Sequence, residues 1–139
     1  MAGKITFTMI KPSAFSAGYT GKILAKIEEG GFRIVTMKKV CLTREMAGHF
    51  YEMHAGKPFY EELTAFMSSG PIVAVVLEKE NAVEDFRQYI GATDPAKAAE
   101  GTIRKLYGKN MGENAVHGSD SDESAEREAG FFFAFTERS

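Results

Sequence analysis

The chain has 139 residues, 44% of them hydrophobic, and its 17 Lys and Arg against 19 Asp and Glu give a net charge of −2. This length suits one domain with a real core, so we expect a single domain over residues 1–139. The near-neutral charge excludes an overall basic footprint and argues against nucleic acid as the main partner. A local cluster of charge can still bind anions.

Cysteine content and hydropathy bear on the compartment. The single cysteine, Cys41, excludes an internal disulfide framework. The N-terminal stretch MAGKITFTMIKP holds too short an apolar run for a signal peptide. The longest apolar run, IVAVVL at residues 72–77, is far too short to span a membrane. We therefore expect a cytoplasmic protein without a membrane partner.

The apolar pattern predicts strands separated by helices. KITFTMI (4–10) is expected as the first strand, limited by Pro12, and FRIVTMKKVCL (32–42) as the second. IVAVVL (72–77) is a continuous apolar run, which predicts a central strand covered on both faces or placed at an interface. FFFAF (131–135) is expected as a final buried strand.

Helices are predicted between these strands at residues 19–29, 59–67 and 81–91, the last with Asn81 as its N-cap. Thr43 is expected to cap a further helix, whose buried stripe is formed by Met46, Phe50 and Met53. Asp120 and Glu123 have the spacing of a capping box, which predicts a last helix that ends at Gly130.

The order of elements reduces to β-α-β-β-α-β, the split motif of ferredoxin-like sandwiches. We therefore predict an α/β (α+β) fold in which a four-stranded, mostly antiparallel sheet is covered by helices on one face. A doubly wound parallel sheet is the alternative, and the long excursion over residues 91–130 argues against it.

The sequence gives little support for a metal site on the protein. His49 and His54 are five residues apart and diverge on a helix, while Cys41 has no nearby partner. A Walker phosphate loop and a GxGxxG motif are both absent. If the chain handles nucleotides, it uses neither of these glycine-loop solutions.

Two basic residues suit a phosphate site. Lys11 follows the first strand in IKPSAF, where a rigid proline can direct the lysine into a cleft. Arg104, in GTIRKLYGK, belongs to a glycine-rich basic loop whose exposed backbone donors suit a phosphate. A solvated lysine and a solvated surface loop are the alternatives, and the residues alone leave both open.

Three further side chains lie on helices or at a helix start. Val83, Phe86, Arg87 and Ile90 fall at i, i+3, i+4 and i+7, so Arg87 lies on or beside a core-facing stripe and needs an anionic partner or a route to water. Tyr51 and Phe59 both suit ordinary core aromatics. Phe59, which follows a proline, also suits a stacking platform for a base.

His117 is the most informative titratable residue. Gly118 leaves its ring accessible, and the N-terminus of the last helix lies nearby and stabilises negative charge. At pH 7 an unperturbed imidazole is mostly neutral, and the neutral form is the nucleophile. These facts allow covalent catalysis without requiring it, and a surface or core histidine is the alternative.

The segment NAVHGSDSDESAEREAGFFF (114–133) resembles the active-site signature N-x-x-H-G-S-D of nucleoside diphosphate kinases. KPFYEEL, MSSGPIVAVVLE, NAV, GATDP and GTIR are similar to segments of that family in the same order, so the resemblance covers essentially the whole chain. One departure is Met111, about where many members carry a smaller aliphatic residue beside the base.

The resemblance implies a role for each matching residue. His117 matches the histidine that is phosphorylated on its ring, at the pros nitrogen, and Phe59 matches the aromatic that stacks on the base. Ser119 and Glu128 match a pair that orients the histidine. The residues that match contacts to the phosphates are Lys11, Tyr51, Arg87, Thr93 and Arg104, while Asn114, with Lys11, matches contacts to the ribose.

The implied reaction is ping-pong transfer of the terminal phosphate from a nucleoside triphosphate to a nucleoside diphosphate, which maintains triphosphate pools. Mg²⁺ is expected to arrive with the nucleotide phosphates. The resemblance also implies a homo-oligomer, a tetramer or a hexamer, although the short C-terminus weakens this inference. The alternatives are a non-catalytic nucleotide-binding module, and a phosphohistidine donor to other proteins or a nucleic-acid-binding member.

Overall fold

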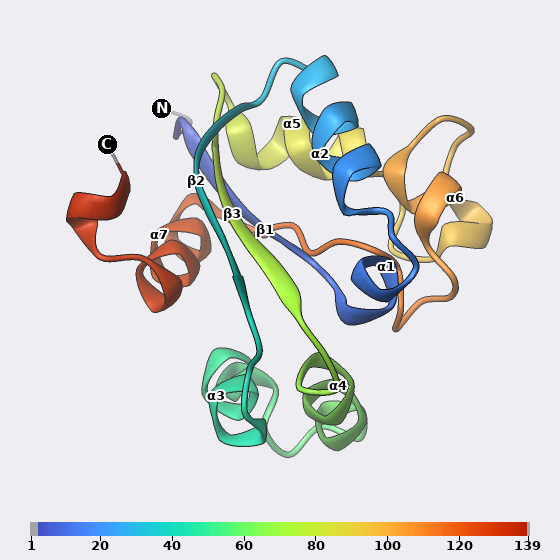
Figure 1. The fold of residues 1–139 in the computed structure, drawn as a ribbon, viewed down its shortest axis with the longest axis vertical. Coiled ribbons are helices and arrows are strands. Elements are labelled where there is room, and N and C mark those ends of the chain that lie inside the picture. The colour runs from blue at the N-terminus through green and yellow to red at the C-terminus, as the bar shows by residue number, and fades with distance from the viewer. Residues whose placement is uncertain (1–2, 139) are drawn as a thin grey trace.

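The computed structural model describes residues 3–138 and contains a central sheet with helices around it (Figure 1). The elements in chain order are β1 (Ile5–Ile10), α1 (Pro12–Ser16), α2 (Thr20–Glu29), β2 (Arg33–Val40), α3 (Arg44–Phe50), η1 (Glu52–His54), α4 (Tyr60–Met67), β3 (Ile72–Glu78), α5 (Ala82–Ile90), η2 (Pro95–Lys97), α6 (Ile103–Tyr107), α7 (Asp122–Phe132) and η3 (Phe135–Arg138). Among these residues no helix is both long enough and apolar enough to cross a membrane.

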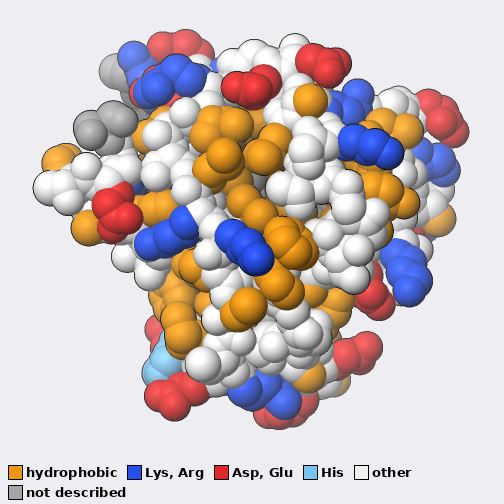
Figure 2. Space-filling model, in the orientation of Figure 1, with side chains coloured by type: hydrophobic (Ala, Val, Ile, Leu, Met, Phe, Trp, Pro, Cys, Tyr) orange, Lys and Arg blue, Asp and Glu red, His pale blue; other side chains and the backbone are white. Residues whose placement is uncertain are grey.

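The sheet has the strand order β1-β3-β2, and both pairs of neighbours are antiparallel. β3 is central and its side chains are buried on both faces, as its continuous apolar run predicts. β2 forms one edge, and its register shifts between Ile34 and Thr36. Figure 2 shows hydrophobic side chains gathered over the middle of the β2 side, and Met37 in β2 is half-exposed.

Helices cover both faces of the sheet, so the prediction of one covered face is wrong. On one face, Phe7, Met9 and Val76 pack in a cluster with residues of α3, α4 and α7. On the other, Val75 and Leu77 pack with residues of α2 and α5. The α/β sandwich itself is confirmed. The second layer of helices exists because the segments after β2 and after residue 120 fold back onto the opposite face.

The fourth strand position is occupied by a different segment from the one predicted. FFFAF (131–135) does not form a strand: α7 continues to Phe132, beyond Gly130, and the ring of Phe132 stacks on Phe7 at 5.4 Å between centroids. Residues 115–119 instead run antiparallel along the free edge of β1. Val116 forms an isolated bridge with Ile10, and the His117 amide donates to the Met9 carbonyl at 3.0 Å.

Side chains replace part of the regular ladder at this edge, which is why residues 115–119 are not a formal strand. The Phe7 amide donates to Ser119 Oγ at 3.2 Å, and Thr8 Oγ1 donates to the His117 carbonyl at 2.6 Å. The described residues therefore contain three strands rather than four. The 115–119 segment nevertheless takes the place of the last strand in the split motif, beside β1.

The helix caps follow the sequence only in part. Thr43 caps α3 as predicted, accepting from the Met46 amide at 3.0 Å. The predicted stripe is wrong, because Phe50 is buried while Met46 and Met53 are 42% and 48% exposed. Asn81 occupies the N-cap position of α5 as predicted, but it is left-handed, and its side chain donates to Asp85 instead of capping the helix. The predicted capping box is wrong, because Ser121, not Asp120, accepts from the Ser124 amide at the start of α7.

Candidate active site

A cleft of about 1100 Å³ opens beside the 115–119 edge. Its walls come from α4, from α5 and the loop after it, and from the irregular segment that precedes His117. Seven predicted site residues line it: Lys11, Phe59, Arg87, Thr93, Arg104, Asn114 and His117. The three others, Tyr51, Ser119 and Glu128, are buried. The structure thus gathers residues from six separate elements and loops around one cavity.

His117 is held from behind by a buried carboxylate. Its Nε2 lies 2.8 Å from Glu128 Oε1, and Ser119 Oγ donates to the same oxygen at 2.7 Å. Because an ionised carboxylate only accepts, Nε2 must carry the proton of the neutral ring. The other nitrogen, Nδ1, is then the one with a free lone pair. The side chain is 18% exposed, which leaves the ring accessible from the cleft that it lines.

Aromatic packing fixes the plane of the same ring. The rings of Phe7 and Phe50 contact His117 with centroids at 6.0 and 5.8 Å. Tyr51 lies against Phe50 at 4.9 Å, and burial, followed by the nearby Glu128 carboxylate, raises the pKa of Tyr51 above its usual range. The Tyr51 hydroxyl therefore stays protonated, so it can act as a neutral donor.

Lys11 is an unusual cation because it is nearly fully buried. Its Nζ donates to Asn114 Oδ1 at 2.8 Å, and Asn114 in turn donates to the Thr93 carbonyl at 2.9 Å. Burial, and then the Arg104 charge, lower the pKa of Lys11 to about 7. A ligand with negative charge would reverse this shift, because it would stabilise the ammonium form.

The two arginines occupy the cleft differently. Arg104 donates to the carbonyls of Gly91 and Val116 at 3.2 and 3.0 Å, which ties the loop after α5 to the His117 segment. Burial, and then the Arg87 charge, lower the pKa of Arg104 to about 10. Arg87 lies beside the apolar stripe of α5, as predicted, but its side chain is exposed and forms no ion pair within residues 3–138.

The remaining lining is apolar and open. Phe59 is 47% exposed at the cleft, with the ring of His54 at 5.2 Å from its own, and Met111 is also exposed there. A flat exposed ring at the mouth of a cationic cleft suits stacking of a planar group. At the other side of the cleft, Gly118 packs so closely on α5 that a Cβ there would lie 3.0 Å from Ile90.

Two residues that contact this arrangement were not predicted. Thr8 fixes the His117 carbonyl, and Arg127 NH2 lies 3.5 Å from Glu128 Oε2. The sequence did hold a signal for Thr8: Thr6 and Thr8 alternate with apolar residues in β1. All four positions from Thr6 to Met9 are buried, and a buried hydroxyl needs a hydrogen-bond partner. Arg127 gave no signal of its own, because neighbouring residues on a helix do not normally face each other.

The donors in the cleft do not form a metal cage. Within residues 3–138 no group of three or more His, Cys, Asp and Glu is arranged to hold a metal ion. The cleft that His117 lines is instead also lined by three cations whose charges act on one another, Lys11, Arg87 and Arg104. Such a set fits the phosphates of a nucleotide that brings its own divalent ion.

The fold and the cleft together define a class: an α/β sandwich with an edge histidine that faces clustered cations, as expected of an enzyme acting on phosphorylated ligands. A sequence model described as nucleoside diphosphate kinase matches residues 4–138. The chain therefore belongs to the nucleoside diphosphate kinase family. It is a nucleotide-binding kinase, and its reaction is phosphoryl transfer to nucleoside diphosphates.

Individual relatives support this assignment. The chain is 62% identical to a nucleoside diphosphate kinase of Flavobacterium psychrophilum over 138 residues, which is 99% of each chain. Among solved structures, it is similar to the Aquifex aeolicus nucleoside diphosphate kinase, with a TM-score of 0.95 and 44% identity over 98% of this chain and 99% of that one. A Halobacterium salinarum nucleoside diphosphate kinase in complex with CDP aligns with a TM-score of 0.91 and 40% identity over 96% and 90%.

Proposed function

We propose that the chain, as one nucleoside diphosphate kinase domain, transfers phosphate by a ping-pong mechanism through a phosphohistidine at His117 Nδ1. The observation that carries this proposal is the Glu128 contact to Nε2, which leaves Nδ1 as the free nitrogen at the cleft. Neutral imidazole with a fixed tautomer is a competent nucleophile. A histidine that only filled space would not need a buried carboxylate.

In the first half-reaction, the Nδ1 lone pair attacks the terminal phosphorus of a nucleoside triphosphate. A P–N bond forms, the bond from that phosphorus to the bridging oxygen breaks, and the nucleoside diphosphate leaves with the electron pair. In the second half-reaction, a terminal phosphate oxygen of another nucleoside diphosphate attacks the same phosphorus. The P–N bond then breaks, and its electron pair returns to Nδ1.

The cations of the cleft would bind the charge that spreads over the phosphoryl oxygens. Arg87 and Arg104 supply fixed positive charge, and Lys11 supplies a charge that the nucleotide itself restores. Tyr51 and Thr93 would add neutral donors. Asn114, which is bonded to Lys11, would hold the ribose hydroxyls. Each charged hydrogen bond contributes about 1.5–3 kcal/mol.

The open end of the cleft would hold the base. Phe59 offers a π-face to any base without reading its edge, so we expect little base selectivity. Met111 would close the other side loosely, because its side chain is flexible. Mg²⁺ that arrives with the nucleotide would neutralise part of the phosphate charge, and Lys11, Arg87 and Arg104 would neutralise the rest.

The wider role follows from this reaction. An enzyme that passes phosphate among different nucleosides maintains triphosphate pools, and we place it in the cytoplasm, where nucleotides and Mg²⁺ are available. We also propose a homo-oligomer. The free edge of β2 and the half-exposed Met37 on it support this, because a bare edge strand is commonly covered.

The test is the chemistry of the labelled protein. After incubation with ATP labelled in its terminal phosphate, the protein should carry a phosphate that acid removes and base does not. The label should pass to any added nucleoside diphosphate. Mapping the label to Ser119 or Ser121 instead of His117 would contradict the proposal.

A further inference from the structure

Glu128 uses its two carboxylate oxygens for different purposes. Oε1 accepts from both His117 Nε2 and Ser119 Oγ, at 2.8 and 2.7 Å. Oε2 faces the guanidinium of Arg127, with NH2 at 3.5 Å. The Glu128 side chain is only 7% exposed, so water contributes little to holding its carboxylate in one orientation. The orientation of the carboxylate therefore depends on these three neighbours.

The Arg127 contact is not what a helix produces by default. Residues i and i+1 on a helix point about 100° apart, so an ion pair between them needs both side chains to turn to one side. Arg127 is turned by a second anchor: NH1 donates to the Phe50 carbonyl at 3.5 Å, at the end of α3. Its guanidinium also lies over the Phe50 ring, 5.8 Å from the centroid.

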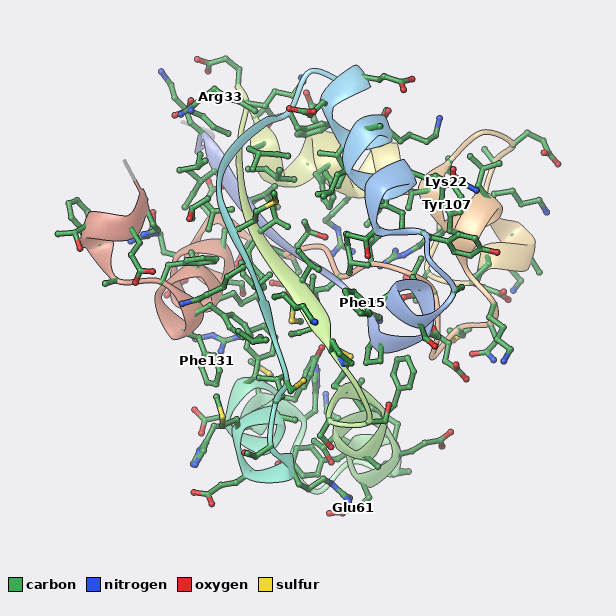
Figure 3. All side chains as sticks on the ribbon, in the orientation of Figure 1. Phe15, Lys22, Arg33, Glu61, Tyr107 and Phe131 are labelled. Carbon is green, nitrogen blue, oxygen red and sulfur yellow. The ribbon has the colours of Figure 1, made fainter. Side chains whose placement is uncertain are left out.

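Arg127 thereby connects two groups that hold His117 from different sides. Phe50 packs its ring on the His117 ring at 5.8 Å, and Glu128 bonds the Nε2 atom. Phe131, one turn further along α7, contacts Phe50 at 5.3 Å and lies toward α3 in Figure 3. The Arg127 side chain is 40% exposed and does not line the cleft, so it has no direct route to the nucleotide.

We infer that Arg127 is a positioning residue for phosphoryl transfer, which acts through Glu128 and Phe50 to hold the His117 ring with Nε2 protonated and Nδ1 directed to the cleft. This inference rests on the proposed phosphohistidine mechanism. With the guanidinium removed, Oε2 loses a cationic partner and the carboxylate can rotate away from the geometry that serves His117 and Ser119.

The kinetic test compares three variants. Arg127→Met keeps most of the stem and removes the charge, and Arg127→Lys restores a charge that can reach Oε2 but cannot also form the planar contacts to Phe50. Arg138→Gln is the matched control, because it breaks another ion pair of α7, to Glu126 at 3.1 Å, that does not involve Glu128. The rate of phosphoenzyme formation from ATP and the KM for ATP are measured for each.

Arg127→Met should slow phosphorylation roughly 3- to 10-fold with KM changed less than twofold, which is the scale of a partly exposed ion pair with a desolvated partner. Arg127→Lys should recover part of the loss, and Arg138→Gln should react like the parent protein. A rate for Arg127→Met equal to that of the parent, a loss confined to KM, or an equal loss in Arg138→Gln would overturn the inference.

Nitrogen NMR of the His117 ring separates this inference from the proposed function. Without nucleotide, the parent protein should show a single tautomer with the proton on Nε2, and Arg127→Met should show a mixture. An unchanged tautomer in Arg127→Met overturns the positioning role even if the parent forms a phosphohistidine. A parent protein that forms no phosphoenzyme at all overturns the proposed function, whatever the NMR result.

Discussion

The two sides of the His117 cleft are built in opposite ways. Behind the ring, Ser119, Glu128 and Thr8 are buried and joined by hydrogen bonds between segments far apart in the chain. In front of it, Phe59, Arg87 and Met111 are exposed. The buried side fixes one atom of the protein in one orientation. The exposed side leaves room for ligands of different shape, so defects on the two sides should have different kinetic signatures.

The largest effect on the rate of phosphate transfer is expected at His117, which lies between the two sides. His117→Ala should lower transfer by at least about 10⁴-fold, because it removes the nucleophile, while nucleotide binding should remain. Activity is measured as the appearance of a second triphosphate from ATP, and binding by calorimetry. His49→Ala, which changes an exposed histidine outside the cleft, is the control and should be fully active. Retained transfer in His117→Ala would refute the nucleophile assignment.

A defect on the buried side should reduce turnover alone. Glu128→Gln removes the acceptor charge at Nε2 and should lower kcat roughly 100-fold, the scale of losing support to a general acid–base or nucleophilic group, with little change in KM. Glu126→Gln, the same change on the same helix but paired with Arg138, should have no such effect. Equal losses in both variants would mean that charge on α7, rather than the His117 contact, matters.

A defect on the exposed side should change affinity instead. Phe59→Ala should weaken nucleotide binding about tenfold, the lower part of the range for loss of base stacking because the ring is already half-exposed. The loss should be similar for purine and pyrimidine nucleotides and should leave kcat near its parent value. A loss restricted to one base would show that Phe59 belongs to a site that reads base edges.

The smallest effect should be the pH dependence of nucleotide binding that is caused by Lys11, which is buried but also lines the cleft. Its pKa of about 7 in the free protein must rise when phosphates bind, so binding above pH 7 takes up a proton. Affinity should then fall about fivefold from pH 7 to pH 8, and calorimetry in buffers of different ionisation enthalpy should detect the uptake. Lys11→Arg stays charged and should abolish it. The same depressed pKa makes the free protein more stable as pH rises above 7, because the unfolded chain binds more protons there.

The sequence and the structure agree where the chemistry of a segment was local. The apolar run of β3 and the Thr43 cap were both readable from the printed residues. They disagree where distant contacts decided the outcome. Residues 115–119, AVHGS, show no strand pattern, and they become an edge partner of β1 through backbone bonds together with the side chains of Ser119 and Thr8. The phenylalanines after Gly130 have high strand propensity, but packing on Phe7 keeps them in and beside a helix.

The site was predictable to a different extent. His117 and the cationic residues were accessible through motifs, and the structure brings them to one cleft. The contact of His117 with Glu128 was not available from spacing, since eleven residues and the start of a helix separate them. Met46 and Met53 were predicted to be buried but are exposed, because helical periodicity alone could not show which face of these short helices meets the core.

The edge contact between β1 and residues 115–119 also sets the order in which the molecule can be completed during synthesis. The bonds that hold His117 join residues about a hundred positions apart, as between Phe7 and Ser119 or Lys11 and Asn114. A ribosome releases β1 first and α7 almost last, so a nascent chain carries an uncovered β1 edge through most of its elongation. Closure of this edge and the appearance of the reactive histidine are then one late event, and a chain that stalls before residue 115 exposes the edge while lacking the site.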